Sequence, residues 1–400
     1  MRVGLLTTSF PRDDRDIAGS FVLGFARALH AQGHAIDVLA PEPRTRTPPP
    51  RWPGIEVRHV PYLRPRALQR TFYGAGVPDN LRRDLAAWLG LGPFTCALTA
   101  AAHGGGRDWD ALISHWALPC ALAAGLVRSR HQRHVAVLHS ADVHLLTRVP
   151  GGRALALAIA RGADVLWFTN RQHEAAFLAL LPPGTQSPER VVSPMGIDWP
   201  NPRGHCAERR AQFRRRHRLE RFSVLTLGRL IPIKGIDLAI RAAAAGGMTL
   251  LVAGDGPERP ALERLARELR ADARFLGTIT GEDKRDWIEA ADAFALPSRR
   301  SASGRSEGVP TALLEAMAHG LPLTAANVGG VSDVLQGDAL ATQLVIPDNP
   351  AALAATLSAL RHHAAHARAV SEHGRRLARS YAWDRLGPRI SKLIEPLGGT

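Results

Sequence analysis

The stretch SEGVPTALLEAMAHG, residues 306–320, decides how this chain is interpreted, because it places two carboxylates around the start of an apolar helix. Glu307 stands before a Gly-Val-Pro turn, and Glu315 stands inside the helix. Gly308 permits a close backbone approach, and Pro310 fits the first helical position. The free N–H groups at such a helix start favour an anion. The stretch therefore predicts an anion site flanked by two acidic side chains.

A second stretch, VLTLGRLIPIKG at 224–235, supplies positive charge. Gly228 and Arg229 follow a buried strand, and Lys234 precedes the next helix. Ligands of open α/β sheets bind at the carboxyl ends of strands, where a fixed Arg and Lys can clamp two phosphates. Only three of the chain's residues are lysines, so a lysine here is conspicuous. Together with the helix start, this pair would neutralise a diphosphate without a metal.

The two glutamates could then bind other parts of a ligand that carries this diphosphate. Glu315 would accept two hydrogen bonds from a ribose diol, and Glu307 would reach a sugar hydroxyl. The plainer interpretation is a solvent-facing Glu315, a Glu307 that only complements the helix dipole, and two ordinary surface cations. From the residues alone, both interpretations stay open.

Strands and helices alternate along the 400 residues, which implies parallel sheets of the α/β class. Strands are expected at 3–8, 35–41, 111–116, 135–140, 164–169, 273–278, 292–298 and 321–326, and a strand followed by a turn is expected at 223–230 and at 248–257. The pattern restarts after PMGID at 194–198. We therefore expect two Rossmann-like domains, 1–197 and 198–380, with a cleft between them. The segment 381–400 is expected to form a last helix that returns to the first domain.

The motifs GRLIPIKG, AGDGP, FLG, EGVPTALLEAMAHGLP and NVGG occur in this order. As a set they resemble retaining glycosyltransferase family 4, of the GT-B fold, and Glu307 with Glu315 resembles that family's E-x7-E motif. The first half adds SFPRDDRDIAGSF, YGAGVPDNL and HSAD, so the resemblance covers nearly the whole chain. It implies transfer of a sugar from a nucleoside-diphosphate sugar to an acceptor, with retention and without a metal or other cofactor.

The resemblance also implies roles for particular residues. The diphosphate would be bound at Gly228, Arg229 and Lys234. The ribose would be bound by Glu315. The donor sugar would contact Glu307 and the backbone of Gly308, Val309 and Pro310.

Three further positions follow from the resemblance. Gly19 is similar to the small residue that lets donor phosphate and acceptor meet. His139 is similar to the histidine that points at the transferred sugar, and the backbone near Thr278 would face the base. A buried structural histidine is the alternative for His139, and it is the preferred interpretation of His115.

The chain departs from the family pattern in places. His139-Ser140-Ala141-Asp142 stands where His-Gly-x-Asp is common, and Asp333 stands where glutamate is commoner. These departures leave the sugar open, and both UDP and GDP donors remain.

The formal charge of +15 invites an anionic partner. Nine arginines fall between Arg44 and Asp84, and Arg82 and Arg83 flank a stripe formed by Leu81, Leu85, Trp88 and Leu89. This stripe suits a helix on an anionic membrane surface. The resemblance implies that the first domain holds the acceptor, a lipid-linked or cell-surface glycan intermediate, so segment 44–91 is a candidate for docking this domain on the inner membrane face. A core-facing stripe on a merely basic protein is the alternative.

Other classes are less favoured. The apolar run 85–102 is interrupted by glycine and proline, so we expect the end of one helix and the start of another instead of an embedded segment. Three scattered cysteines and no signal peptide indicate a cytoplasmic protein without a metal site. A GT-B sugar-nucleotide epimerase and a non-catalytic protein that binds anionic lipid or nucleic acid remain the alternatives, although no nucleic acid is expected.

Overall fold

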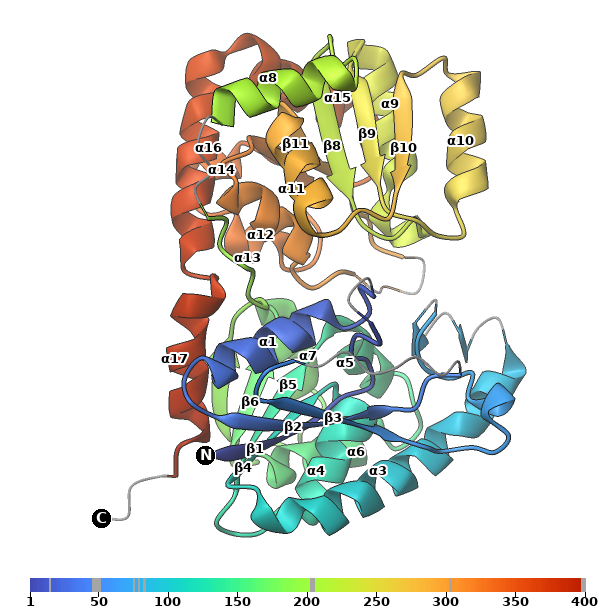
Figure 1. The fold of residues 1–400 in the computed structure, drawn as a ribbon, viewed down its shortest axis with the longest axis vertical. Coiled ribbons are helices and arrows are strands. Elements are labelled where there is room, and N and C mark those ends of the chain that lie inside the picture. The colour runs from blue at the N-terminus through green and yellow to red at the C-terminus, as the bar shows by residue number, and fades with distance from the viewer. Residues whose placement is uncertain are drawn as a thin grey trace. The chain divides into compact units, whose positions relative to one another are not determined.

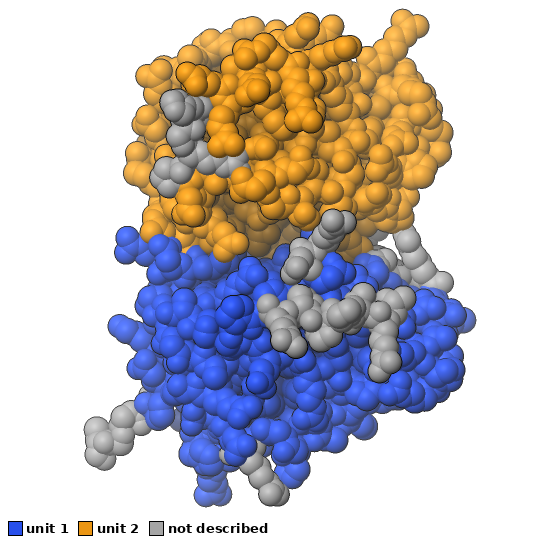
Figure 2. Space-filling view, in the orientation of Figure 1, with its two compact units in different colours: residues 1–196, 383–400 blue, residues 197–382 orange. Residues whose placement is uncertain are grey.

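The computed structural model divides the chain into two compact units, which Figure 2 shows in different colours. Unit 1 contains residues 1–196 and 383–400, and unit 2 contains residues 197–382. The structure describes residues 1–13, 16–44, 52–74, 76–77, 80–81, 84–201, 206–301, 304 and 306–396. Arg82 and Arg83, which the sequence placed beside the apolar stripe, lie outside the described residues.

Unit 1 is built on a seven-stranded parallel sheet in the order β3-β2-β1-β4-β5-β6-β7 (Figure 1). Its strands are β1 (Arg2–Leu6), β2 (Ala35–Pro41), β3 (Ile55–Val60), β4 (Ala111–His115), β5 (Arg133–Leu138), β6 (Val165–Phe168) and β7 (Glu189–Val192). The strands expected from apolar runs are confirmed to within two residues. Strands β3 and β7 were not predicted, because these edge strands carry polar residues on their exposed sides and lack the continuous apolar run of an interior strand.

Helices cover both faces of this sheet. They are α1 (Ser20–His30), α3 (Leu91–Gly105), α4 (Leu122–Val127), α5 (Ser140–Leu146), α6 (Gly152–Gly162), α7 (Arg171–Leu178) and α17 (Trp383–Ile394). Val3 and Leu5 point to a cluster that includes residues of α1 and α17, whereas Leu6 points to a cluster that includes α3. The last helix of the chain therefore packs against α1 in the unit formed by the N-terminal half.

Short helical segments fill the loops of unit 1. They are η1 (Arg66–Leu68), η2 (Leu85–Gly90), η3 (Gly106–Asp108) and η4 (Ala117–Ala121). The apolar run is thus η2 followed by α3, as expected. Leu85–Gly105 is long and apolar enough, on length and composition alone, to be a candidate membrane span among the described residues. However, Phe94 and Leu98 are fully buried, and the Phe94 ring packs on Phe72 at 4.4 Å, so α3 contributes to the core of unit 1.

Unit 2 contains a six-stranded parallel sheet in the order β10-β9-β8-β11-β12-β13. Its strands are β8 (Ser223–Leu227), β9 (Thr249–Ala253), β10 (Ala273–Gly277), β11 (Ala293–Leu296), β12 (Leu323–Ala326) and β13 (Leu344–Val345). Its helical segments are α8 (Cys206–Arg216), η5 (Pro232–Lys234), α9 (Ile236–Gly246), α10 (Arg259–Glu268), α11 (Gly281–Ala290), α12 (Thr311–Ala318), α13 (Val331–Val334), α14 (Asp338–Ala341), α15 (Pro350–His362) and α16 (Ala364–Arg379).

Each sheet has one point where the strand order reverses. In unit 1 this point lies between β1 and β4, and in unit 2 it lies between β8 and β11. Loops that leave the two strands there diverge to opposite sides and open a space at the carboxyl ends, where open α/β sheets bind ligands. These two points are therefore where functional side chains are expected in each unit.

Candidate functional site

In unit 2, residues from the loops after β8 and β11 meet at this point. The Lys234 ammonium lies 2.5 Å from Oε1 of Glu307, and the Ser298 hydroxyl donates to Oε2 of Glu307 at 2.7 Å. Both charged side chains are mostly shielded from solvent, with 16% and 11% of their surface exposed. The structure thus joins a residue predicted to bind diphosphate to one predicted to contact a sugar.

Close backbone contacts bring these loops together. Gly235, which follows Lys234, has a φ of +61°, and a Cβ there would lie 2.0 Å from the carbonyl oxygen of Pro297 in the β11 loop. Gly329 in NVGG has a φ of +63°, and a Cβ there would lie 2.0 Å from the carbonyl oxygen of Glu307. Only glycine fits these positions, so both glycines serve the placement of Lys234 and Glu307.

Gly228 and Arg229 follow β8 directly, at the same edge of the sheet. A Cβ on Gly228 would meet the side chain of Lys234 at 3.2 Å. The absence of a side chain at Gly228 therefore leaves room for the lysine to lie across the end of β8. We refer to Gly228, Arg229 and Lys234, which share the loop after β8, as the basic corner.

The turn Gly308-Val309-Pro310 leads into α12 at the end of the β11 loop. The sequence predicted Pro310 as the first helical residue, and this is wrong. Its ψ of 128° is extended, so Pro310 is the N-cap residue and the helix begins at Thr311. The first N–H groups of α12 have no carbonyl partner within the helix. The Leu313 N–H donates to the Pro310 carbonyl at 3.0 Å, and the partial positive charge at the start of α12 favours an anion there.

Glu315 lies in α12 and has a partner that the sequence did not suggest. The Lys284 ammonium on α11 donates to Oε1 of Glu315 at 2.9 Å. Two of the chain's three lysines thus bind the two glutamates of the E-x7-E pair. The rarity of lysine was the signal that pointed to Lys234, and the same signal would have found Lys284. Nothing in the sequence singled out Ser298.

Thr278 is exposed just after β10, two strands away from β8 in the sheet. Close contacts join the three strand ends, since the Gly254 N–H donates to the Gly277 carbonyl at 2.7 Å and the Gly228 N–H donates to the Ala253 carbonyl at 2.9 Å. Thr278 therefore stands at the same edge as the basic corner, beyond the end of β9.

Gly19 and His139 belong to unit 1. Gly19 has a φ of +70° before α1, and a Cβ there would lie 2.3 Å from the carbonyl oxygen of Ser9. His139 follows β5 and is half-buried. The Phe21 ring in the first turn of α1 packs on His139 at 5.2 Å, so Gly19 and His139 lie in neighbouring segments of this unit. Burial lowers the pKa of His139 to about 3.

His115, expected to be a structural histidine, is fully buried at the end of β4. Its Nδ1 lies 3.2 Å from Nε2 of His139. Burial holds the pKa of His115 well below its ordinary value. His115, which was predicted to be only structural, therefore contacts His139, which was predicted to face the transferred sugar.

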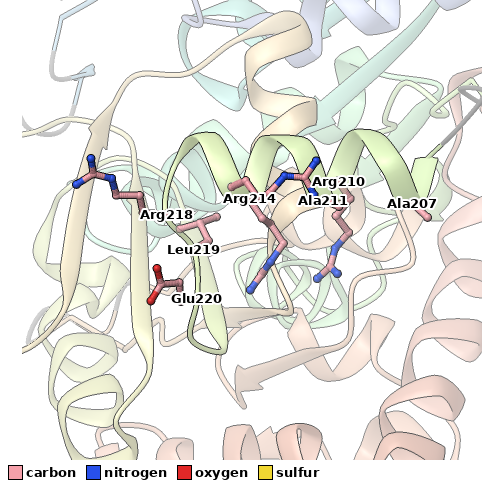
Figure 3. A pocket seen from close by; sticks show the side chains of 8 residues that line it. Ala207, Arg210, Ala211, Arg214, Arg218, Leu219 and Glu220 are labelled. Carbon is pink, nitrogen blue, oxygen red and sulfur yellow. The ribbon is translucent and has the colours of Figure 1, made fainter.

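A pocket of about 550 Å³ lies elsewhere in unit 2, against α8 (Figure 3). Arg210 and Arg214 line it, but both guanidinium groups contact the Asp292 carboxylate, at 2.5 and 3.0 Å. They also donate to backbone carbonyls at the end of α11. These contacts attach α8 to the sheet, so the pocket is a structural feature of the helix surface.

Among the described residues, no group of three or more His, Cys, Asp and Glu side chains is arranged to hold a metal ion.

Known proteins share this architecture and parts of this sequence. Anabaena Alr3699/HepE, solved in complex with UDP and glucose, has a TM-score of 0.71 at 17% identity, and the match covers 98% of each chain. This likeness confirms the GT-B fold expected from the motifs. D-inositol 3-phosphate glycosyltransferase of Xylanimonas cellulosilytica is 28% identical over 398 residues, which cover 91% of this chain and 88% of the relative.

A relative from Mycobacterium tuberculosis is named GDP-mannose-dependent alpha-(1-6)-phosphatidylinositol monomannoside mannosyltransferase. It is 31% identical over 230 residues, which cover 55% of this chain and 58% of the relative, so the match spans little more than half its length. Residues 221–363, which carry the basic corner and both glutamates, match the family described as glycosyl transferases group 1. Residues 221–363 are thus similar to the group 1 glycosyltransferases.

Proposed function

We propose that the protein transfers a sugar from a nucleoside-diphosphate sugar to an acceptor hydroxyl, with retention of configuration and without a metal. The observation that carries this proposal is the meeting of Lys234 and Glu307 at the strand-order reversal of unit 2, with Glu315 on the helix that begins there. The group 1 match over the same residues supports it.

The diphosphate would bind to Arg229, Lys234 and the first amides of α12. An ammonium has three donors, so Lys234 can keep its contact with Glu307 while it donates to a phosphate oxygen. Glu315 would accept from the ribose hydroxyls, and Glu307 from a hydroxyl of the transferred sugar. The base would lie toward Thr278.

No enzyme nucleophile is required. The bond from the anomeric carbon to the phosphate oxygen breaks, and a bond from that carbon to the acceptor oxygen forms on the same face of the sugar. The departing phosphate oxygen takes the proton of the acceptor hydroxyl. Catalysis would then consist of positioning and of stabilising the charge that develops on the phosphate.

The proposal is tested by incubating the protein with UDP-, GDP- and ADP-sugars and a membrane lipid extract as the source of acceptor hydroxyls, in EDTA, and measuring the release of each nucleoside diphosphate. We expect release from donors of one base and product with retained anomeric configuration. Release that depends strictly on added Mg²⁺ would contradict the metal-free route. Conversion of the donor into another sugar nucleotide would instead identify an epimerase, and turnover of none of the donors would favour a basic binding protein.

We further propose a lipid-linked or cell-surface glycan acceptor, reached from the cytoplasmic face of the membrane. The name of the M. tuberculosis relative includes a glycolipid, phosphatidylinositol monomannoside. In unit 1, Leu85, Trp88 and Leu89 of η2 are exposed by 86%, 54% and 62%. Such a cluster of exposed apolar side chains on a strongly basic chain suits an anionic bilayer.

The structure corrects one part of the docking prediction. Leu81 is buried, so the stripe is the three residues of a 3₁₀ helix and not a longer α-helical face. Arg64 and Arg66 both contact the buried Glu42 carboxylate, so these two arginines help to hold their loop in place. The docking surface is therefore better tested through the apolar side chains than through these arginines.

A Leu85→Ser/Trp88→Ser/Leu89→Ser variant should bind anionic vesicles at least ~10-fold more weakly than the wild type, because each apolar side chain contributes on the order of 1 kcal/mol or more when buried. Cosedimentation with phosphatidylglycerol vesicles measures the difference. Leu126→Ser, which changes another exposed leucine of unit 1, is the matched control. Equal binding by the triple variant and the control would remove the docking surface from the proposal.

A further inference from the structure

The pair of histidines in unit 1 has a geometry that points to a defined proton position. His115 ends β4, beside the strand-order reversal, and His139 follows β5. Their rings are stacked with centroids 5.4 Å apart and an interplanar angle of 20°. Nδ1 of His115 and Nε2 of His139 are 3.2 Å apart, a hydrogen-bond distance. One of these two nitrogens must carry the proton.

No anion in the described surroundings stabilises a charged ring in this pair. The nearest buried carboxylate, Asp142 on α5, accepts the backbone N–H groups of Ala117, His139 and Val143 at 2.7 to 3.1 Å. Phe21, Phe25 and Trp116 surround the rings with aromatic carbon. Each imidazole is therefore neutral, with one N–H and one bare nitrogen.

The second nitrogen of His115 decides between the two arrangements. Nε2 of His115 is buried and has no hydrogen-bond partner among the described residues. A proton on Nε2 would leave an N–H donor buried without an acceptor, which proteins tolerate less often than a bare acceptor. The proton of His115 therefore belongs on Nδ1, where it is donated to Nε2 of His139.

We propose that His115 is a positioning residue that fixes the tautomer of His139. Nε2 of His139 accepts the hydrogen bond, so His139 keeps its own proton on Nδ1. The competing arrangement, in which the His139 side chain accepts the Asp142 N–H at the start of α5, would put the His139 proton on Nε2 and leave the Nε2–H of His115 buried without an acceptor among the described residues. The group that His139 offers to a substrate is then an N–H donor, suited to a hydroxyl oxygen of the transferred sugar. This last step rests on the proposed function, whereas the tautomer does not.

The tautomer can be measured directly on the full chain without any substrate. In protein labelled with ¹⁵N-histidine, long-range ¹H–¹⁵N spectra distinguish protonated from bare ring nitrogens, and a His139→Gln variant assigns the His139 signals. We expect His139 to carry its proton on Nδ1. A proton on Nε2 of His139 in the wild type would overturn the proposal, whatever the activity of the protein.

Variants at position 115 test whether His115 is the cause. His115→Asn keeps an N–H donor near the position of Nδ1 and should preserve the Nδ1–H form of His139. His115→Leu removes the donor and should shift His139 toward the Nε2–H form. His134→Leu, which changes another buried histidine of the same sheet, should leave the His139 spectrum unchanged. A His139 spectrum that is identical in all three variants would also overturn the proposal.

Turnover gives an independent readout. We expect His115→Leu to lower kcat by about 10-fold, in line with the loss of one hydrogen bond, with an unchanged KM for the donor and with recovery in His115→Asn. A wild type that turns over no donor would refute the proposed function and leave the spectra to decide the tautomer. If His115→Leu does not fold, the wild-type and His115→Asn spectra still decide it.

Discussion

An Arg229→Ala/Lys234→Ala variant is expected to lose the thermal stabilisation that a nucleoside diphosphate gives to the wild type. A ligand at 100 times its dissociation constant stabilises a folded protein by about 2.7 kcal/mol. Removing both cations from the end of β8 leaves only backbone amides to meet two phosphates. Thermal unfolding with UDP, GDP and ADP, each in Mg²⁺ and in EDTA, measures the effect. In the wild type we expect a shift with one nucleotide in both buffers.

The unfolding temperature of the double variant without ligand will itself be lower than that of the wild type. Glu307 loses its ammonium partner while it stays largely buried, and an uncompensated buried charge is costly. Each ligand-induced shift in the unfolding temperature must therefore be measured relative to the same variant without ligand. Arg241→Ala/Lys392→Ala removes one arginine and one lysine at exposed positions on α9 and α17, and it should respond like the wild type. A full ligand shift in Arg229→Ala/Lys234→Ala would show that diphosphate binds elsewhere.

The site could be predicted from the sequence wherever one short segment carries the information. The loop after β8 and the turn before α12 are such segments, because a buried strand, a glycine and a charged residue follow one another within a few positions. The structure places both at the reversal between β8 and β11, where the topology of a parallel sheet opens a space.

Contacts between distant segments could not be predicted in the same way. Lys284 reaches Glu315 across 31 positions of the chain, and His115 reaches His139 across 24. The sequence pattern gives which side of a strand is buried, but it does not give which side chains meet at neighbouring strand ends. The strand order supplies this information. The strand order also explains why His115, which was predicted to be only structural, contacts His139.

The 3₁₀ geometry of η2 was missed for a different reason. The apolar stripe there matches helical spacing, yet Gly90, Gly92 and Pro93 follow within a few residues. Asp84 caps the segment through the Ala86 N–H at 2.9 Å, and Leu85, Trp88 and Leu89 remain exposed. Spacing alone therefore identified the apolar residues but not the extent of their helix.

The variants Glu307→Gln and Glu315→Gln should distinguish the roles of the two glutamates of the E-x7-E pair. Loss of the charge on Glu307 weakens its hydrogen bond to the transferred sugar, and bonds to charged groups are worth about 1.5–3 kcal/mol. If that bond strengthens as the sugar departs, kcat falls by roughly 10- to 150-fold. Lys234 then loses its counter-charge and donates to phosphate at least as well as before, so we expect the affinity for the diphosphate to hold or rise.

Glu315→Gln should do the opposite, because its carboxylate would bind the ribose equally in substrate and transition state. We expect nucleotide affinity to fall by roughly 10- to 150-fold and kcat at saturating donor to stay near the wild-type value. The Lys284 contact is part-exposed, so its loss should change the free energy of unfolding by less than about 1 kcal/mol. Calorimetric titration with the nucleoside diphosphate and steady-state kinetics measure both variants. Equal losses of affinity in the two variants would mean that Glu307 binds the nucleotide and not the sugar, and the roles assigned at this corner would have to be exchanged or merged.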